Sequence, residues 1–412
     1  MILSREPRID LTYCLNVHPG QNWAAQREAI ERCSVRIKRE ISPDKPFGLG
    51  LRIANLASEE LQSESLRREA GEFFGRHGCY PFTINGFPYD HFHGSAVKEK
   101  VYLPDWQSEK RRLYTCRLAA QLAEWLPEGM TGSISTLPGS YKSWINRESE
   151  VAAMVSNLIE TVLVLEEIRE RTGREIHLGL EPEPDCYLET TEETVRFFED
   201  QLFPEGVQAI QARMKISSAN AEAIVRRHLG VCFDTCHLAL QFEDLAVSWR
   251  RFEEAGIRIS KVQISNALEV PAIPEAWGTL ETFVEPVYLH QVKAKCKSGG
   301  VTGWPDLPAA LLSLPKAAEK LECLRVHFHV PLFFEGGDEL GTTAHCLSPE
   351  FFRLLRGGSC PHLEIETYTY HVLPDAIRPP TLEESVVKEY RWVLEKLGCD
   401  PGSVADGGEP NG

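Results

Sequence analysis

The feature that most constrains the fold is a regular alternation of short β-type runs with helical segments along most of the 412 residues. This pattern is typical of parallel strands covered by helices, and eight strands suit a closed (β/α)8 TIM barrel. A doubly wound sheet is the alternative, but no GxGxxG follows the first run. The expected strands are Ile9–Asn16, Phe47–Ile53, Cys79–Asn85, Thr131–Leu137, Ile176–Glu181, Leu229–Asp234, Ile259–Ser265 and His362–Thr367.

One stretch interrupts this alternation. After the seventh strand, two further β-type runs, VYLHQVKAK and LRVHFHV, flank a helical DLPAALLSL. We therefore expect a hairpin-bearing insertion, at about residues 285–331, between strand 7 and its helix. The barrel should form a single domain of residues 1–398, and the Gly-, Pro- and Asp-rich residues 399–412 are expected to be disordered.

Composition narrows the partners and the location. Sixty acidic residues against 44 basic ones give a net charge of −16, which disfavours nucleic acid and anionic lipid as partners. No apolar run approaches the roughly 20 residues of a membrane helix, and the first residues lack the apolar stretch of a secretory signal. Twelve scattered cysteines without a CxxC pair indicate reduced thiols. We expect a cytoplasmic protein.

Acidic and amide side chains end several of the expected strands. Glu181 ends the fifth strand and Asp234 the sixth, Gln263 lies near the end of the seventh, and Glu366 ends the eighth. Barrel active sites are built at these ends, and buried carboxylates are costly unless a cation balances them. Four such oxygens predict a site for Mn²⁺ or Mg²⁺, and Zn²⁺ is also possible. The alternative for any one of them is a helix cap or an ion pair.

A second group of possible ligands contains nitrogen. His327 and His329 alternate in the run VHFHV, which places both on one face of a strand, and His237 in DTCH could complete a three-nitrogen site. Hydrogen-bonded histidines in a half-buried strand are the alternative. Glu183 and Glu364 are expected to support the ligands.

Three other histidines lie where a substrate could reach them. His18 follows the first strand, and His91 and His93 belong to NGFPYDHFHG, which has the composition of an ordered loop over the barrel mouth. We expect His18, His91 and His93 to contact substrate, with metal binding as an alternative for the last two.

These residues also carry a resemblance. FDTCH on the sixth strand, between glutamates that end the fifth and eighth, resembles the xylose-isomerase-like barrel superfamily, which includes sugar isomerases, epimerases and apurinic endonucleases. The strings LTYCLNVHPG, PFTINGFPYDHFHG, YLHQV, RVHFHVPLF and HLEIETYTYHVLP together resemble the metabolite traffic protein EboE family over roughly residues 10 to 374. The resemblance implies a role in moving a metabolite together with partner proteins, some of them membrane-associated.

Within the superfamily, a Glu, an Asp, a His and a Glu bind one metal ion. The matching positions here are Glu181, Asp234, Gln263 and Glu366, so an amide replaces the histidine and weakens the implied zinc site. The endonucleases add a site that His237, His327 and His329 would match. Their third site has no counterpart, because Cys79 and Leu137 stand at its histidine positions, which argues against DNA cleavage.

Three functions remain open at this point. The first is a metal-dependent isomerase or epimerase of a small hydroxyl-bearing molecule, with Glu181 and Glu366 exchanging a proton and His237 binding a hydroxyl or a second ion. The second is a two-metal phosphoester hydrolase. The third is a protein without catalytic activity that binds a metabolite and hands it to a partner.

Overall fold

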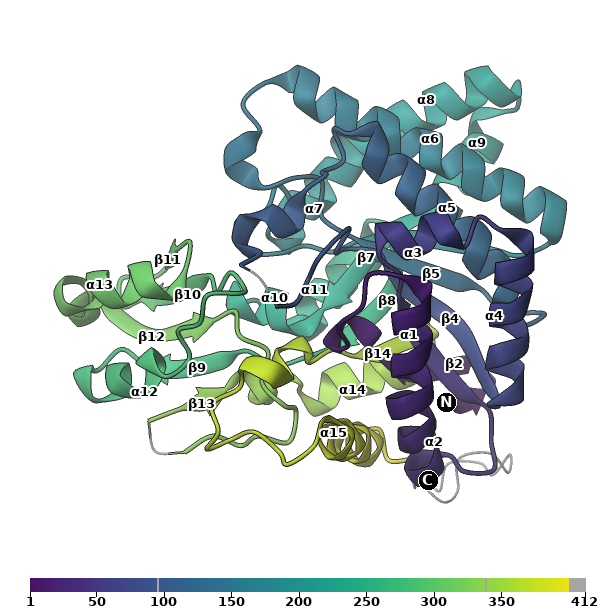
Figure 1. Ribbon diagram of the computed structural model, residues 1–412. Coiled ribbons are helices and arrows are strands. Elements are labelled where there is room, and N and C mark those ends of the chain that lie inside the picture. Colours follow the sequence, from purple (N-terminus) through teal and green to yellow (C-terminus); the bar gives the residue numbers. More distant parts are fainter. Residues whose placement is uncertain (95, 338, 400–412) are drawn as a thin grey trace.

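Eight parallel strands form the centre of the molecule (Figure 1). The computed structural model describes residues 1–94, 96–337 and 339–399. The strands follow the order β2-β14-β8-β7-β6-β5-β4-β3, and a parallel bridge between Cys14 and Gly50 joins the two ends of the sheet. The fold is therefore a (β/α)8 barrel, as predicted. Its strands are β2 (Arg8–Tyr13), β3 (Phe47–Arg52), β4 (Cys79–Asn85), β5 (Gly132–Thr136), β6 (Ile176–Leu180), β7 (Leu229–Asp234), β8 (Arg258–Ile264) and β14 (His362–Ile365).

Helices surround the barrel, and a short strand, β1 (Ile2–Arg5), pairs antiparallel with β2. Helices α1 and α2 are joined by a π-helical turn, as are α7 and α8. The helices around the barrel are α1 (Trp23–Ala29), α2 (Val35–Ile41), α3 (Asn55–Glu60), α4 (Glu64–Arg76), α5 (Glu109–Trp125), α6 (Glu148–Thr172), α7 (Thr191–Phe197), α8 (Phe203–Met214), α9 (Ser218–His228), α10 (Thr235–Leu240), α11 (Leu245–Glu254), α14 (Pro349–Arg356) and α15 (Leu382–Lys396).

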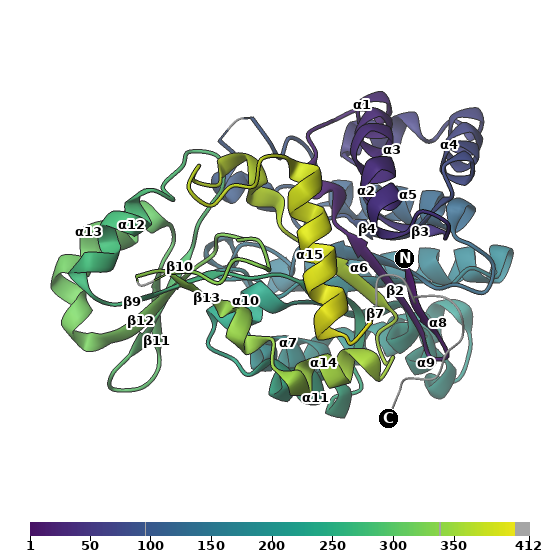
Figure 2. The same ribbon diagram turned by 90° about the horizontal axis from the view of Figure 1, so that it is seen from below.

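A second, antiparallel sheet lies between β8 and α14 and stands beside the barrel (Figures 1 and 2). Its order is β11-β10-β12-β9-β13, and it has an apolar core of its own. We call this unit the insertion; its sheet spans Leu268–Thr342, a longer stretch than the 285–331 expected from the sequence. Its elements are β9 (Leu268–Pro271), α12 (Trp277–Glu281), β10 (Val292–Cys296), β11 (Val301–Trp304), α13 (Leu307–Ala317), β12 (Leu321–Val326) and β13 (Gly341–Thr342).

The insertion contacts the barrel through apolar and charged side chains. Its apolar core also includes Leu373, which follows β14, and its Tyr288 packs against Phe92 and Tyr368. Lys293 of β10 reaches Asp185, at 2.8 Å, and Glu189 on the loop after β6. Arg325 of β12 donates to the carbonyl of Ala239 in α10. These contacts hold the insertion over the mouth of the barrel at β6 and β7.

An ion pair lies inside the barrel. Lys261 of β8 contacts Glu364 of β14, and both side chains are fully buried. Burial alone would lower the pKa of Lys261, but the attraction of Glu364 outweighs it and raises that pKa above its usual value. Gly50 of β3 leaves the necessary space, because a Cβ there would collide with the Glu364 carboxylate. The interior of the barrel is thus charged as well as apolar.

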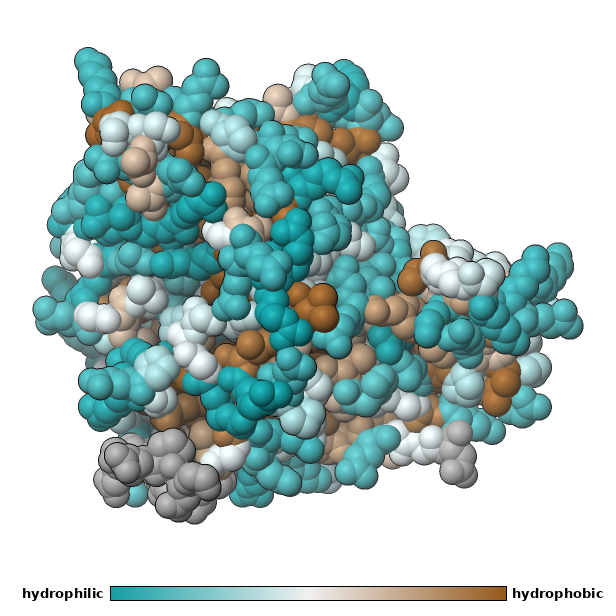
Figure 3. All heavy atoms as spheres, turned by 180° about the vertical axis from the view of Figure 1, so that it is seen from behind, coloured by the Kyte–Doolittle hydropathy of each residue, from teal (hydrophilic) through white to brown (hydrophobic). Residues whose placement is uncertain are grey.

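The face of the molecule in Figure 3 is largely polar, and the cysteines are not paired in disulfides. Figure 3 shows a largely hydrophilic face on which hydrophobic side chains form small, separate patches. Among the described residues, no helix is both long and apolar enough to cross a bilayer. All twelve cysteines are free thiols. Of the segment 399–412, for which disorder is expected, residues 400–412 lie outside the described residues.

Candidate metal centre

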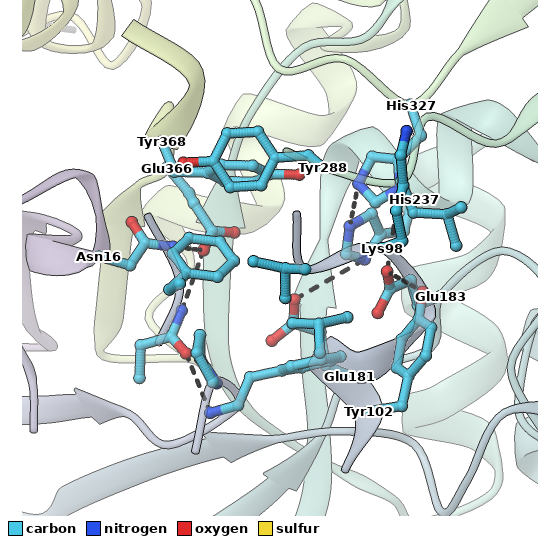
Figure 4. A pocket seen from close by; sticks show the side chains of 17 residues that line it. Asn16, Lys98, Tyr102, Glu181, Glu183, His237, Tyr288, His327, Glu366 and Tyr368 are labelled. Atoms are coloured by element: carbon cyan, nitrogen blue, oxygen red, sulfur yellow. Dashed lines mark hydrogen bonds and ion pairs between the residues drawn. The ribbon is translucent and has the colours of Figure 1, made fainter. Parts of the chain in front are cut away.

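A small cavity lies at the carboxyl ends of the barrel strands, where the active sites of such barrels are built. Residues of the insertion and of the loop after β4 cover it. Figure 4 shows Glu366 with Asn16 on one side and His237 with His327 on the other. The lining residues are Asn16, Asn85, Phe87, Pro88, Phe92, Val97, Lys98, Val101, Tyr102, Glu181, Glu183, His237, Tyr288, Leu289, His327, Glu366 and Tyr368.

Three carboxylates converge at this cavity. Glu181 follows β6, Asp234 ends β7 and Glu366 follows β14, and each offers an oxygen within 4.8 Å of the other two. Asn16 and Asn85 both donate to Oε1 of Glu366, at 2.7 and 2.9 Å. Oε2 of Glu181 and Oδ2 of Asp234 are buried and have no hydrogen-bond partner in the described part of the chain. Since such orphaned oxygens are costly, this carboxylate group fits a divalent cation.

The electrostatics agree with that assignment. Burial, followed by repulsion from Asp234, raises the pKa of Glu181 well above its usual value. Burial and repulsion from Glu181 do the same for Glu366. Burial also acts to raise the pKa of Asp234, but the attraction of His237 and His329 outweighs it, so this pKa is lowered. A cation would relieve the repulsion that raises the first two.

Three histidines form a second group beside the carboxylates. Nε2 of His237 lies 3.1 Å from Nε2 of His327, which in turn lies 3.3 Å from Nε2 of His329. All three side chains are buried. Oδ2 of Asp234 is 3.9 Å from Nε2 of His237, so Asp234 adjoins both groups. His327 and His329 directly follow β12, which ends at Val326, instead of lying within a strand as expected.

The hydrogen bond made by Nδ1 fixes the tautomer of each of these three histidines. Each Nδ1 faces an oxygen that can only accept, so each Nδ1 carries the hydrogen and each Nε2 presents a lone pair. Lone pairs at 3.1 and 3.3 Å repel one another unless a cation lies between them. These rings therefore offer donors for a metal ion, and the ligand atoms of Asp234, His237 and His329 lie within 4.8 Å of one another. The Nδ1 contacts are His237 with the Pro182 carbonyl (3.1 Å), His327 with the Gln291 side-chain oxygen (2.7 Å) and His329 with the Glu366 carbonyl (2.9 Å).

Gln291 holds one of these rings through its side chain. Its amide nitrogen donates to the Tyr102 hydroxyl at 2.9 Å and to the Pro184 carbonyl at 3.0 Å. The amide oxygen is therefore the atom that faces His327. Tyr102 in turn donates to Glu183, at 2.9 Å, and burial raises the pKa of that carboxyl to about 8. Gln291, Tyr102 and Glu183 thus form a hydrogen-bonded chain that orients His327.

Replacing Gln291 tests this support. Gln291→Leu removes the acceptor for Nδ1 of His327, so we expect the affinity of the histidine group for Zn²⁺ to fall by about 10–100-fold, which is typical when such a partner is lost. Competition with a chelating dye would measure it. Gln291→Glu is the matched control, because it keeps an acceptor and should retain the ion. Unchanged affinity in Gln291→Leu would contradict this role.

Gln263 lies in the barrel interior and does not line the cavity. The Cys232 thiol donates to its side-chain oxygen at 2.9 Å, and its amide nitrogen has no partner among the described residues. The oxygen expected to bind a metal ion thus already accepts a hydrogen bond. Its role as a fourth ligand stays a prediction.

The three histidines expected to contact substrate lie outside the lining of the cavity. His18 bonds to the Tyr13 hydroxyl at 2.8 Å and borders a separate cavity of about 280 Å³. His91 is exposed on an outer groove of about 1990 Å³. His93 contacts the Asn16 carbonyl at 2.5 Å and the Tyr288 hydroxyl at 2.6 Å, so it supports two lining residues. Contact with substrate remains a prediction for all three.

No protein-family model and no curated protein matches the chain. Three solved structures are similar to it at 12% identity. The match to IolI protein with a bound zinc atom covers 95% of this chain and 98% of the IolI chain, with a TM-score of 0.43. The 3-keto-D-glucoside 4-epimerase YcjR from E. coli covers 94% and 99%, with a TM-score of 0.41. An AP endonuclease of family 2 from Brucella melitensis covers 56% and 73%, with a TM-score of 0.33. The fold assignment rests on the strand order described above, and membership of the EboE family stays a prediction.

Proposed function

We propose that the chain is a metal-dependent enzyme of the isomerase or epimerase type that acts on a small hydroxyl-bearing molecule. The observation that carries this proposal is the convergence of three Nε2 lone pairs and two orphaned carboxylate oxygens at a covered cavity. The finer proposal is a cytoplasmic enzyme that resembles the EboE family and acts in metabolite traffic with membrane-associated partner proteins.

The two donor groups suit different ions. Glu181, Asp234 and Glu366 supply oxygens, which Mn²⁺ and Mg²⁺ prefer, whereas the histidines together with Asp234 suit Zn²⁺. A divalent ion at such a site polarises a carbonyl or hydroxyl oxygen and so makes an adjacent proton easier to remove.

The side chains supply the proton transfer. Glu366 accepts from both asparagines through Oε1, which holds its carboxyl at the cavity. Glu181 has one oxygen without a partner among the described residues. In this proposal one of the two carboxyls accepts a substrate proton and the other donates one. His237 lines the same cavity and would bind a substrate hydroxyl or hold a second ion.

The variant Glu366→Gln tests this role. The amide can still accept from Asn16 and Asn85 but cannot exchange a proton, so we expect a loss of turnover of about 10²–10⁴-fold with an unchanged fold. The measurement is incorporation of solvent deuterium into a panel of hydroxy-carbonyl sugars, followed by NMR, with circular dichroism as the folding control. Full exchange in this variant, in a panel that the wild type labels, would rule out the role.

The proposal as a whole is tested by metal stoichiometry, measured by elemental analysis on protein purified without chelator or a metal-binding tag. One or two ions per chain support a metal-dependent enzyme. No bound ion after incubation with Mn²⁺ and Zn²⁺ would overturn it and leave a protein that binds a metabolite and passes it on.

The second candidate is a two-metal phosphoester hydrolase. The observation that favours it is the position of Asp234, which belongs to both donor groups, as a carboxylate that bridges two ions would. Two ions per chain together with release of phosphate from an ester would establish hydrolysis. Two ions with deuterium exchange and no hydrolysis would favour the isomerase.

A further inference from the structure

One wall of the cavity is apolar, and it reaches the donor groups, because the ring centroid of Tyr368 lies 4.6 Å from that of His329. Phe92, Tyr288 and Tyr368 pack ring to ring, with centroids 5.1–5.2 Å apart. The Tyr288 hydroxyl is bonded to Nδ1 of His93 at 2.6 Å, so it is not free for a ligand. The lining also contains the apolar side chains of Phe87, Pro88, Val97, Val101 and Leu289. A ligand in the cavity would therefore meet ring faces and methyl groups next to the polar donors.

The cavity has no free cation for an anionic ligand. Among the lining residues, Lys98 is the one lysine or arginine. Its ammonium contacts Oδ2 of Asp306 at 2.7 Å. The other oxygen of Asp306 accepts from the backbone NH groups of His290 and Leu307, both at 3.0 Å, so the carboxylate is fixed at the start of α13. The lysine charge is thus balanced by the insertion before any ligand binds.

The remaining charges in the lining are acidic. Glu181, Glu183 and Glu366 are all buried there, and Asp234 lies beside them. Divalent ions at the donor groups would balance these carboxylates. An anionic group against the apolar wall would lose its hydration and meet no free ammonium among the lining residues, which is unfavourable.

We propose that Asp306 is a specificity-determining residue, which by pairing with Lys98 makes the cavity select uncharged ligands that carry hydroxyls at one end and an apolar group at the other. This inference rests on the proposed function, because it concerns the substrate class of the same site. We therefore do not expect phosphate esters and sugar acids to be preferred substrates when their negative charge lies at the apolar end of the substrate molecule.

Two matched glycosides test the selection on metal-loaded full-length protein by calorimetry. Phenyl β-D-glucopyranoside is uncharged, and 4-carboxyphenyl β-D-glucopyranoside has the same body with one negative charge. We expect the wild type to bind the uncharged probe at least about tenfold more tightly, because the carboxylate loses its hydration in the cavity.

Two variants show whether the ion pair causes the preference. Asp306→Asn keeps the acceptor for the backbone NH groups but releases Lys98, so affinity for the carboxyphenyl probe should rise by about tenfold. The double variant Lys98→Met/Asp306→Asn should lose that gain. Thermal melting of each variant controls for folding.

The outcomes separate this inference from the proposed function. Equal affinity of the wild type for both probes, or an Asp306→Asn variant with no gain, would overturn the substrate class while leaving a site that binds glycosides. If the wild type binds neither probe, the inference and the small-molecule site both fail. A wild-type preference that Asp306→Asn reduces supports the inference.

Discussion

The variant Asp234→Asn should lose the metal that we propose for both donor groups. Asparagine keeps an oxygen that can accept from the NH groups of Cys236 and His237, at 2.7 and 3.2 Å in the wild type, so the start of α10 stays capped. It presents an amide NH₂ where the orphaned Oδ2 stood, which removes a ligand from both donor groups. We expect elemental analysis to find less than about a tenth of the wild-type metal, because each donor group loses a negatively charged ligand.

Single ligand changes should separate the two groups. His327→Ala should cost only the ion held by the histidines, and Glu181→Gln only the ion held by the carboxylates. The exposed His91 supplies the control, since His91→Ala should retain all of the metal. Retention of both ions by Asp234→Asn would show that Asp234 is not shared. Equal losses in His327→Ala and Glu181→Gln would indicate one site instead of two.

Breaking the ion pair inside the barrel should have the largest effect on stability. Lys261→Met leaves Glu364 buried without a counter-charge, and Glu364→Gln does the same to Lys261. We expect each single change to lower the free energy of unfolding by about 3–5 kcal/mol, measured by urea denaturation. The double variant Lys261→Met/Glu364→Gln leaves no charge unpaired, so it should recover most of the loss.

A surface pair of the same type is the control for this experiment. Lys295 lies 3.0 Å from Glu322, and both side chains are close to half exposed. Lys295→Met should change the free energy of unfolding by less than about 1 kcal/mol. If Lys261→Met also changed the free energy of unfolding by less than about 1 kcal/mol, the prediction would be wrong, because water would then reach the ion pair in the barrel.

The barrel could be predicted because its signal is local. Each strand is a short run of apolar and β-branched residues followed by a helix, and the strand ends at Glu181, Asp234 and Glu366 are set by the same periodicity. The predicted insertion, at about residues 285–331, is shorter than its sheet in the structure. The first and last strands of the sheet in the sequence, β9 and β13, have four and two residues, which is too short for a recognisable alternation.

The site could be predicted only in part, for a physical reason. The residue types in VHFHV and DTCH indicated nitrogen ligands, and the structure brings His237, His327 and His329 together. What orients them carries no sequence signal, because two of the three acceptors are backbone carbonyls. The third, Gln291, acts through a contact 36 residues away, which no local pattern reveals.

The candidate ligands come from both the barrel and the insertion, and this affects the order in which the donor groups can form during synthesis and folding. His327 comes 90 residues after His237, and the insertion is synthesised before β14, the strand that completes the barrel. The complete donor set therefore exists only after the insertion has folded around its own core and β14 has added Glu366. If the proposed ions bind, loading of both groups would follow these folding steps, and a chain that stalls before β14 would lack Glu366 as a ligand.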